Sequence, residues 1–207
     1  MGSFGILKIP EWILKFAYVN LLWICFSFLG LVMMGIFPAT IAMFAIFRIW
    51  IMGETDLPIL KNFWNYYKKD FFKSNILGSI LFMIGYTLYI DFQLLQHASA
   101  SVFITILTYV VAAITFMYIL TLLYTFPVFV HYDISVIKVL KTSFLTMIVS
   151  PLPTIMMIAG CIILYFSLRN FLGLVVILGP SLFAFLIMCS AYLSFTNIVK
   201  SKEQPSN

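Results

Sequence analysis

Few residues of this chain have the type and spacing that chemistry requires. Asp91 is the one acid clearly inside a long apolar segment. An ionisable side chain within a membrane is a candidate functional residue, here for a proton or cation site. Asp91 also lies near the outer end of its segment, followed by Gln93, Gln96 and His97, so a solvated rim is the alternative interpretation.

The remaining candidates are weaker. His131 and Asp133 are two residues apart, which is too few ligands for a metal site. The cysteines, Cys25, Cys161 and Cys189, lie in apolar segments without C-x-x-C spacing, and we expect them to be small buried side chains. The phosphate-binding G-x-x-x-x-G-K-[ST] and the nucleophile motif G-x-S-x-G do not occur. The sequence therefore predicts no catalytic residue, no cofactor and no metal, and it does not indicate an enzyme.

Composition assigns the chain to the membrane proteins. Apolar residues make up 63% of the 207 residues, charged residues make up 9%, and the mean hydropathy is +1.10. Soluble domains carry about 25% charged residues, because they need a polar surface. The net charge of +5 is distributed between apolar runs, so anionic lipid headgroups are the expected partner and nucleic acid is not.

The apolar runs predict an all-α, polytopic transmembrane helical bundle that forms a single domain over residues 1–207. A helix needs about 20 apolar residues to cross a hydrocarbon core of about 30 Å. The predicted spans are 12–34, 38–52, 75–96, 101–128, 143–166 and 172–197. The first two are separated at Gly35–Pro38, since proline cannot continue a helix interior. The short segment 38–52 either crosses the membrane or is re-entrant.

The basic residues orient these six spans. Eleven of them fall on the side that carries both termini: Lys8, Lys15, Arg48, Lys61, Lys68, Lys69, Lys73, Lys138, Lys141, Lys200 and Lys202. Only Arg169 falls on the other side. The positive-inside rule therefore places both termini in the cytoplasm. A five-span arrangement, in which 12–52 crosses once, splits the basic residues between the two sides and is disfavoured.

The connection between the second and third spans has the clearest pattern. Residues 57–73 predict an amphipathic helix that begins after a cap at Asp56. One half carries the apolar and aromatic residues, including Phe63, Trp64 and Tyr67, and the other carries Lys61, Lys68 and Lys69. Such a helix lies in the membrane interface with its lysines toward anionic headgroups. It is a candidate docking surface, and the alternative is a helix that rests on lipid or on the protein's own bundle.

The residues of this region resemble a known family. Gly35-Ile-Phe-Pro38-Ala39-Thr40, Arg48-Ile-Trp50 and Gly53-Glu54-Thr-Asp56-Leu-Pro58, continued by Lys61-Asn-Phe63-Trp64, are similar to the YesL-like bacterial integral membrane proteins, whose domain has no known function. The resemblance covers almost the whole chain. It implies a bacterial cell membrane protein whose relatives are often encoded beside ABC-type carbohydrate uptake systems. It supplies no catalytic residues.

Two functional hypotheses follow. The first is an accessory protein associated with carbohydrate uptake, with a permease or other membrane protein as its partner. The second is a small transporter or channel in its own right. Apart from Asp91, Asn20 and scattered serine and threonine, the spans offer few polar residues to line a path, and this favours the accessory role.

Overall fold

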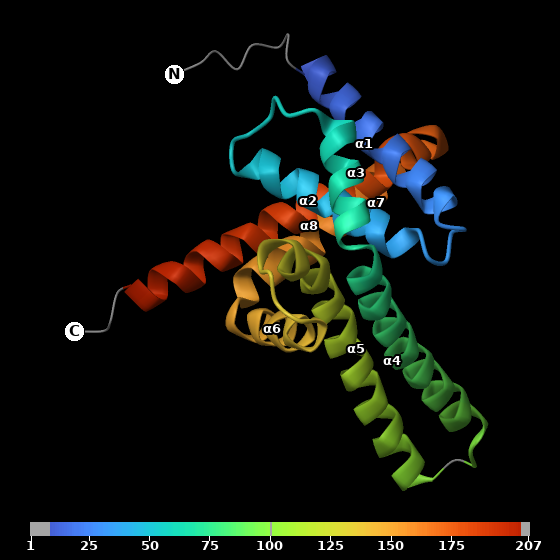
Figure 1. Cartoon of the computed structure of the whole chain (residues 1–207). Helices are drawn as coiled ribbons and strands as arrows, with labels where there is room; N and C mark the ends of the chain where they lie inside the picture. The colour runs from blue at the N-terminus through green and yellow to red at the C-terminus, as the bar shows by residue number, and fades with distance from the viewer. Residues whose placement is uncertain (1–8, 100, 204–207) are drawn as a thin grey trace.

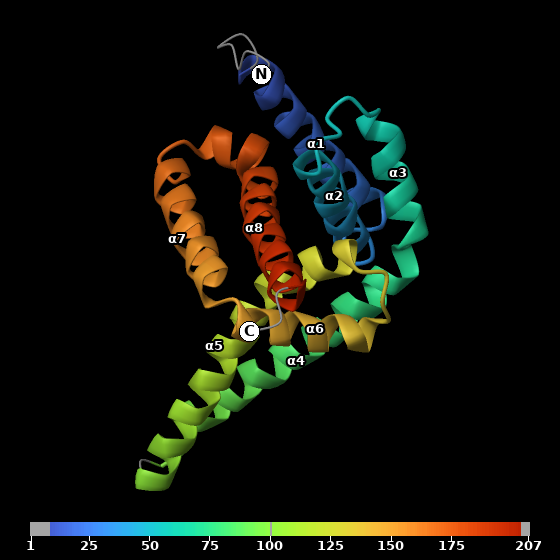
Figure 2. The same ribbon diagram turned by 90° about the vertical axis from the view of Figure 1, so that its left-hand side faces the viewer.

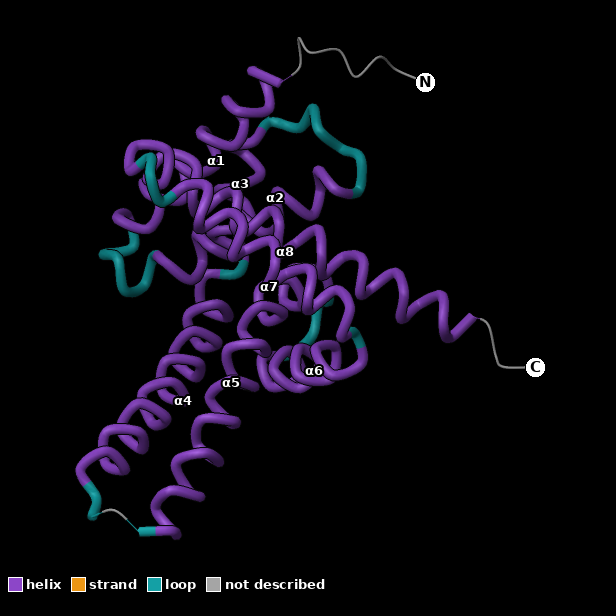
Figure 3. Tube along the Cα trace, turned by 180° about the vertical axis from the view of Figure 1, so that it is seen from behind, coloured by secondary structure: helices purple, strands orange, loops and turns teal. Residues whose placement is uncertain are grey.

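The computed structural model describes residues 9–99 and 101–203, and these residues are helical apart from short turns (Figures 1 and 3). The prediction of an all-α fold is confirmed. The helices are α1 (Ile9–Leu29), α2 (Ile36–Ile51), α3 (Ile59–Lys69), α4 (Phe71–His97), α5 (Val102–His131), α6 (Val136–Val149), α7 (Pro151–Leu168) and α8 (Leu172–Glu203). Lys8 of the predicted basic set lies outside the described residues.

Five of the described helices, α1, α4, α5, α7 and α8, are long and apolar enough to cross a membrane. The chain is therefore a membrane protein whose helices contact lipid. Helix α2 is shorter, with 16 residues, or about 24 Å at 1.5 Å per residue. The number of crossings stays a prediction.

Helix α2 is the centre of the fold rather than a lipid-facing helix. Ten of its residues are buried, and it contacts α1, α3, α4, α5 and α8. One side packs into a cluster with Val19, Phe63 and Met188. Ile41 on its other side belongs to a second cluster, with residues of α4 and α5. Helix α2, although short and strongly apolar, is thus covered by other helices of the protein on several sides.

The predicted span 143–166 is wrong as a single helix. Helix α6 ends at Val149, and α7 begins at Pro151 after Ser150, whose φ of −119° and ψ of 64° are not helical. Proline has no N–H to donate and disfavours a helical conformation in the residue before it. Helix α6 consequently runs across the molecule, while α7 and α8 form a separate hairpin (Figure 2).

The α1–α2 turn is tighter than the sequence indicates. Leu31 and Val32 take the left-handed conformation, with φ of 56° and 61°, whereas Gly35 is right-handed, with φ of −91°. Gly35 is needed for another reason, because a Cβ there would lie 2.2 Å from the carbonyl oxygen of Ser27. The turn depends on close approach of two backbones.

Two asparagine side chains donate to backbone carbonyls that have no partner within their own helix. Pro180 cannot donate to the carbonyl of Val176, and the Asn20 Nδ2 donates to that oxygen at 2.8 Å. The Asn75 Nδ2 likewise donates at 3.0 Å to the carbonyl of Met34, which precedes the N-cap residue Gly35 of α2 and therefore has no partner within that helix. A free backbone carbonyl inside a membrane protein needs such a partner. The asparagines therefore join α1 to α8 and the α1–α2 turn to α4.

Asn20→Leu is expected to lower the free energy of unfolding by about 1 kcal/mol, the usual net value of one hydrogen bond. Pro180→Ala in the same chain should recover part of this loss, since the N–H of residue 180 can then bond to Val176. Reversible unfolding in mixed detergent measures both variants, with the exposed Asn65→Leu as control. Equal stability of Asn20→Leu and the double variant would contradict the capping role.

The contacts of the α1–α2 turn bear on topology. The six-span arrangement separates Met34 from Asn75 by the thickness of a membrane, yet the two residues are hydrogen-bonded. Figure 2 also shows the end of the α4–α5 hairpin and the α7–α8 turn pointing in different directions, although the sequence predicts both to be outside. Membrane placement of the helices therefore requires its own measurement.

Cysteine labelling on intact cells provides that measurement. In a variant without Cys25, Cys161 and Cys189, six spans predict that Ser99→Cys and Asn170→Cys react with an impermeant thiol reagent. Asn65→Cys should react only after permeabilisation. Labelling of Asn65→Cys in intact cells would exclude the six-span arrangement.

Candidate functional site

A polar cavity of about 200 Å³ lies where α2, α3, α4 and α5 meet. Its lining combines cationic, acidic and aromatic side chains with a few apolar residues. The lining residues are Ala45, Arg48, Tyr66, Lys69, Asp70, Lys73, Phe129, Val130, His131, Tyr132 and Asp133. We call this cavity the junction pocket.

The helix ends bring these residues together. Helix α3 ends at Lys69, and Asp70, with φ of −101° and ψ of 9°, turns the chain directly into α4 at Phe71. The last turn of α5 and the extended residue Tyr132 form the opposite wall. Arg48 comes from the last turn of α2. The pocket is therefore built from three separate segments of the sequence, which lie between positions 45 and 133.

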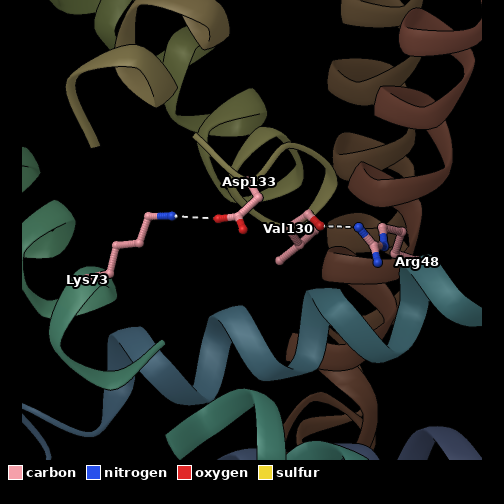
Figure 4. Close-up of polar contacts among 4 residues, drawn as sticks. All are labelled: Arg48, Lys73, Val130 and Asp133. Atoms are coloured by element: carbon pink, nitrogen blue, oxygen red, sulfur yellow. Dashed lines mark hydrogen bonds and ion pairs between the residues drawn. The ribbon is translucent and has the colours of Figure 1, made fainter. Parts of the chain in front are cut away.

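Two polar contacts cross the pocket (Figure 4). The Lys73 Nζ lies 3.2 Å from the Asp133 Oδ1 and forms an ion pair with it. The Arg48 guanidinium donates to the carbonyl of Val130. That carbonyl is among the last four of α5, which have no partner within the helix, and a cation there also opposes the helix dipole. These contacts hold α2 and α4 against the end of α5.

The two carboxyl groups of the pocket differ in their electrostatics. The hydrogen bond from Lys73 lowers the pKa of Asp133, and the charges of Lys73 and Lys69 act in the same direction. Burial raises the pKa of Asp70, although Lys69 and Lys73 oppose this effect. Asp133 is thus held in its charged form, and Asp70 is the carboxyl group that is more easily protonated.

His131 is held mainly by aromatic rings. Its ring stacks on Phe195 with centroids 4.5 Å apart, and the ring of Tyr132 meets it edge-on at 4.7 Å. The His131 Nδ1 and the Arg48 Nε are buried and have no hydrogen-bond partner among the described residues. No group of three potential metal ligands occurs in the described ranges.

The predicted amphipathic helix is present but shorter than 57–73. Helix α3 begins at Ile59 after Pro58 and ends at Lys69. Asp56 is not the cap, because it lies outside the first turn of the helix and Pro58 occupies the N-cap position. The extended conformation of Pro58 (ψ of 103°) prevents an earlier start.

The two faces of α3 have different surroundings. Phe63 and Tyr67 are buried against α1, with ring centroids 5.2 and 5.1 Å from that of Phe26. Trp64, predicted on the same face, is 43% exposed. Lys61, Lys68 and Lys69 are exposed, and Lys69 also lines the junction pocket. The aromatic face therefore rests on the protein's own helices.

Asp91 is not part of the pocket. It is half-buried on α4 near the end opposite to Phe71, and its carboxyl group makes no hydrogen bond or ion pair with another described residue. Asp91, the candidate acid inside a predicted span, is thus separate from the charged groups of the junction pocket. The cysteines also differ from expectation, because Cys25 is exposed and Cys161 and Cys189 are only half-buried. A position inside an apolar segment therefore does not mean burial here, because parts of these segments lie on the outside of the bundle.

The sequence did not identify the pocket. His131, Asp133 and Arg48 were each visible as charged or polar residues at the ends of apolar segments, but nothing in their spacing indicates that they meet. The available signal was a concentration of charge in the two connections 53–74 and 129–142, which the topology placed on the same side. The Lys73–Asp133 ion pair joins those two connections.

The comparisons with known proteins agree on one family. A family described as "Protein of unknown function, DUF624" matches residues 16–92. The uncharacterized protein YteU of Bacillus subtilis (strain 168) is 37% identical over 205 residues, covering 99% of this chain and 91% of YteU. The uncharacterized proteins YesL and YesV of the same organism are 35% and 34% identical, covering 76% and 89% of this chain and 74% and 88% of their own lengths. No solved structure matches the chain. The resemblance to YesL-like proteins is thereby confirmed, and the chain belongs to the DUF624 family of membrane proteins of unknown function.

Proposed function

We propose that this protein is an accessory component of the bacterial cell membrane that acts through another membrane protein, without catalysing a reaction or carrying solute itself. The distribution of polar groups supports the proposal. Charged side chains gather in the junction pocket at one end of the α4–α5 hairpin. Three cavities beside the helices are lined almost entirely by apolar residues, for example Leu81, Ile84, Ile114 and Met117 in one of them. A solute path needs polar groups at mid-membrane instead.

The partner that fits the family resemblance is the permease part of an ABC-type carbohydrate uptake system. The exposed face of α3 offers a surface for it, with Lys61, Lys68 and the half-exposed Trp64. Lysines around an exposed aromatic ring suit an acidic segment of a partner at the membrane surface. In the six-span arrangement, which the cysteine labelling tests, this surface and both termini lie in the cytoplasm.

Changing Lys61 and Lys68 together to glutamine tests this surface. Because exposed charges contribute little to stability, the variant should fold and insert like the parent. Co-purification with transporter subunits and growth on the transported sugar should fall. Lys138→Gln with Lys141→Gln, two exposed lysines on α6, serves as the matched control.

Solute flux distinguishes the accessory role from the transporter alternative. Purified protein in liposomes should show no solute flux if the accessory role is correct. Flux from this chain alone, abolished by Asp91→Asn, would replace the accessory proposal with a transporter that uses an intramembrane acid.

A further inference from the structure

The junction pocket has more positive charge than its own acids neutralise. Lys73 is paired with Asp133 at 3.2 Å. Neither Arg48 nor Lys69 forms an ion pair with a carboxylate among the described residues. Asp70 is the one acid that remains opposite them, and burial raises its pKa. The pocket therefore has an excess of positive charge that a bound anion would neutralise.

The pocket also lies at the ends of two helices that are long enough to cross a membrane. It surrounds the beginning of α4 and the end of α5, which are two of the long apolar helices. The ends of such helices reach the headgroup region of a bilayer. Basic pockets between membrane helices at that level recognise phosphate groups of anionic lipids.

We propose that the junction pocket binds a phosphate-bearing anion, with Arg48 and Lys69 as its cationic contacts. Arginine is suited to this because its planar guanidinium is always charged and matches phosphate oxygens. The volume of about 200 Å³ is many times the roughly 10–15 Å³ that a single water needs, and it accommodates a phosphate group with its ester oxygens. An anionic phospholipid headgroup and a soluble phosphate share this chemistry. The inference does not depend on the accessory role.

The test measures lipid and phosphate binding by the purified full-length chain. For the lipid, the protein is placed in phosphatidylcholine nanodiscs that also contain phosphatidylglycerol. Native mass spectrometry of the released protein then counts the phosphatidylglycerol molecules that stay bound. Inorganic phosphate is titrated against protein in pure phosphatidylcholine nanodiscs, with thermal stability as the readout. Retention of phosphatidylglycerol without a response to phosphate assigns the pocket to a lipid headgroup. A response to inorganic phosphate assigns it to a soluble phosphate as well.

The variants are chosen so that their effects have opposite signs. Lys69→Gln should weaken binding about fivefold, as expected from the loss of one basic contact near a charged surface. Asp70→Asn should strengthen it, because a repelling carboxylate is removed. Lys61→Gln, on the same helix but outside the pocket, should leave binding unchanged. Arg48 is left intact, since its bond to the carbonyl of Val130 also secures the end of α5.

The proposal is overturned by absence of binding of both probes. It is equally overturned if Lys61→Gln and Lys69→Gln weaken binding alike, which would indicate a general charge effect of the surface. Weaker binding in Asp70→Asn would also contradict it, because an anion site should gain from the loss of that acid.

Discussion

Gly35→Ala is expected to destabilise this protein more than a glycine-to-alanine change at any other described glycine. A Cβ at residue 35 would lie 2.2 Å from the carbonyl oxygen of Ser27 and 2.8 Å from that of Phe26. Both obstacles are backbone atoms of α1, which cannot rotate away as a side chain does. Overpacking typically costs 1–3 kcal/mol, and we expect about 3 kcal/mol or more here.

The damage should extend beyond the turn. The Phe26 carbonyl accepts a hydrogen bond from the Tyr67 hydroxyl at 3.2 Å, and the Ser27 carbonyl accepts one from the Val32 N–H at 2.9 Å. Displacing α1 would disturb both bonds. Yield of monodisperse protein and its unfolding midpoint in detergent measure the effect. Gly173→Ala is the control, because nothing lies within 4 Å of a Cβ at that position; equal behaviour of the two variants would show that the turn is loosely packed.

Phe63→Glu should be the second severe change. Phe63 has an exposed fraction of 0% and packs on Phe26 at 5.2 Å. Glutamate at this position removes the aromatic contact and buries a carboxyl group without a partner. The loss of a buried phenylalanine alone costs about 3–5 kcal/mol, and an isolated buried charge adds to this cost or forces protonation.

The comparison with neighbouring positions makes this result specific. Lys68→Glu, which changes an exposed side chain of the same helix, should leave the amount of folded protein in the membrane nearly unchanged. Trp64→Glu should be intermediate, because Trp64 is 43% exposed but still packs on Phe26 and Tyr67. Membrane yield and thermal unfolding in detergent rank the three variants. Equal tolerance of all three would mean that α3 is not docked on α1.

Local features of the fold were predictable. Long apolar runs specify helices, and the prolines at positions 38 and 151 interrupt them because proline cannot donate the next hydrogen bond. The interruption at Pro38 was predicted and the one at Pro151 was not, since the apolar run continues through it and proline is tolerated in membrane helices. The amphipathic pattern of α3 correctly separated Phe63 and Tyr67 from Lys61 and Lys68. Its ends were wrong, because the turn at Asp70 and the extended Pro58 shorten the helix.

The site was not predictable to the same degree. Lys69 was a candidate by its position on a basic face, but its neighbours in the junction pocket come from three other helices. Asp91 was singled out because acids inside apolar segments are rare, and among the described residues it forms no ion pair. A pattern within one helix says which residues share a face, and it contains no information on the distance between two loops.

The sequence by itself determined the class of protein, its helices and its family, because apolar content, proline positions and family motifs are properties of the chain alone. Tertiary structure decided that α2 is the buried centre, that Asn20 and Asn75 bind the backbone carbonyls of Val176 and Met34, and that two distant connections form one charged pocket. The physical reason is that lipid is as apolar as leucine, so hydrophobicity does not distinguish a helix face that contacts lipid from one that contacts protein. Close packing and polar contacts between helices make that distinction, and they exist only once the helices have assembled.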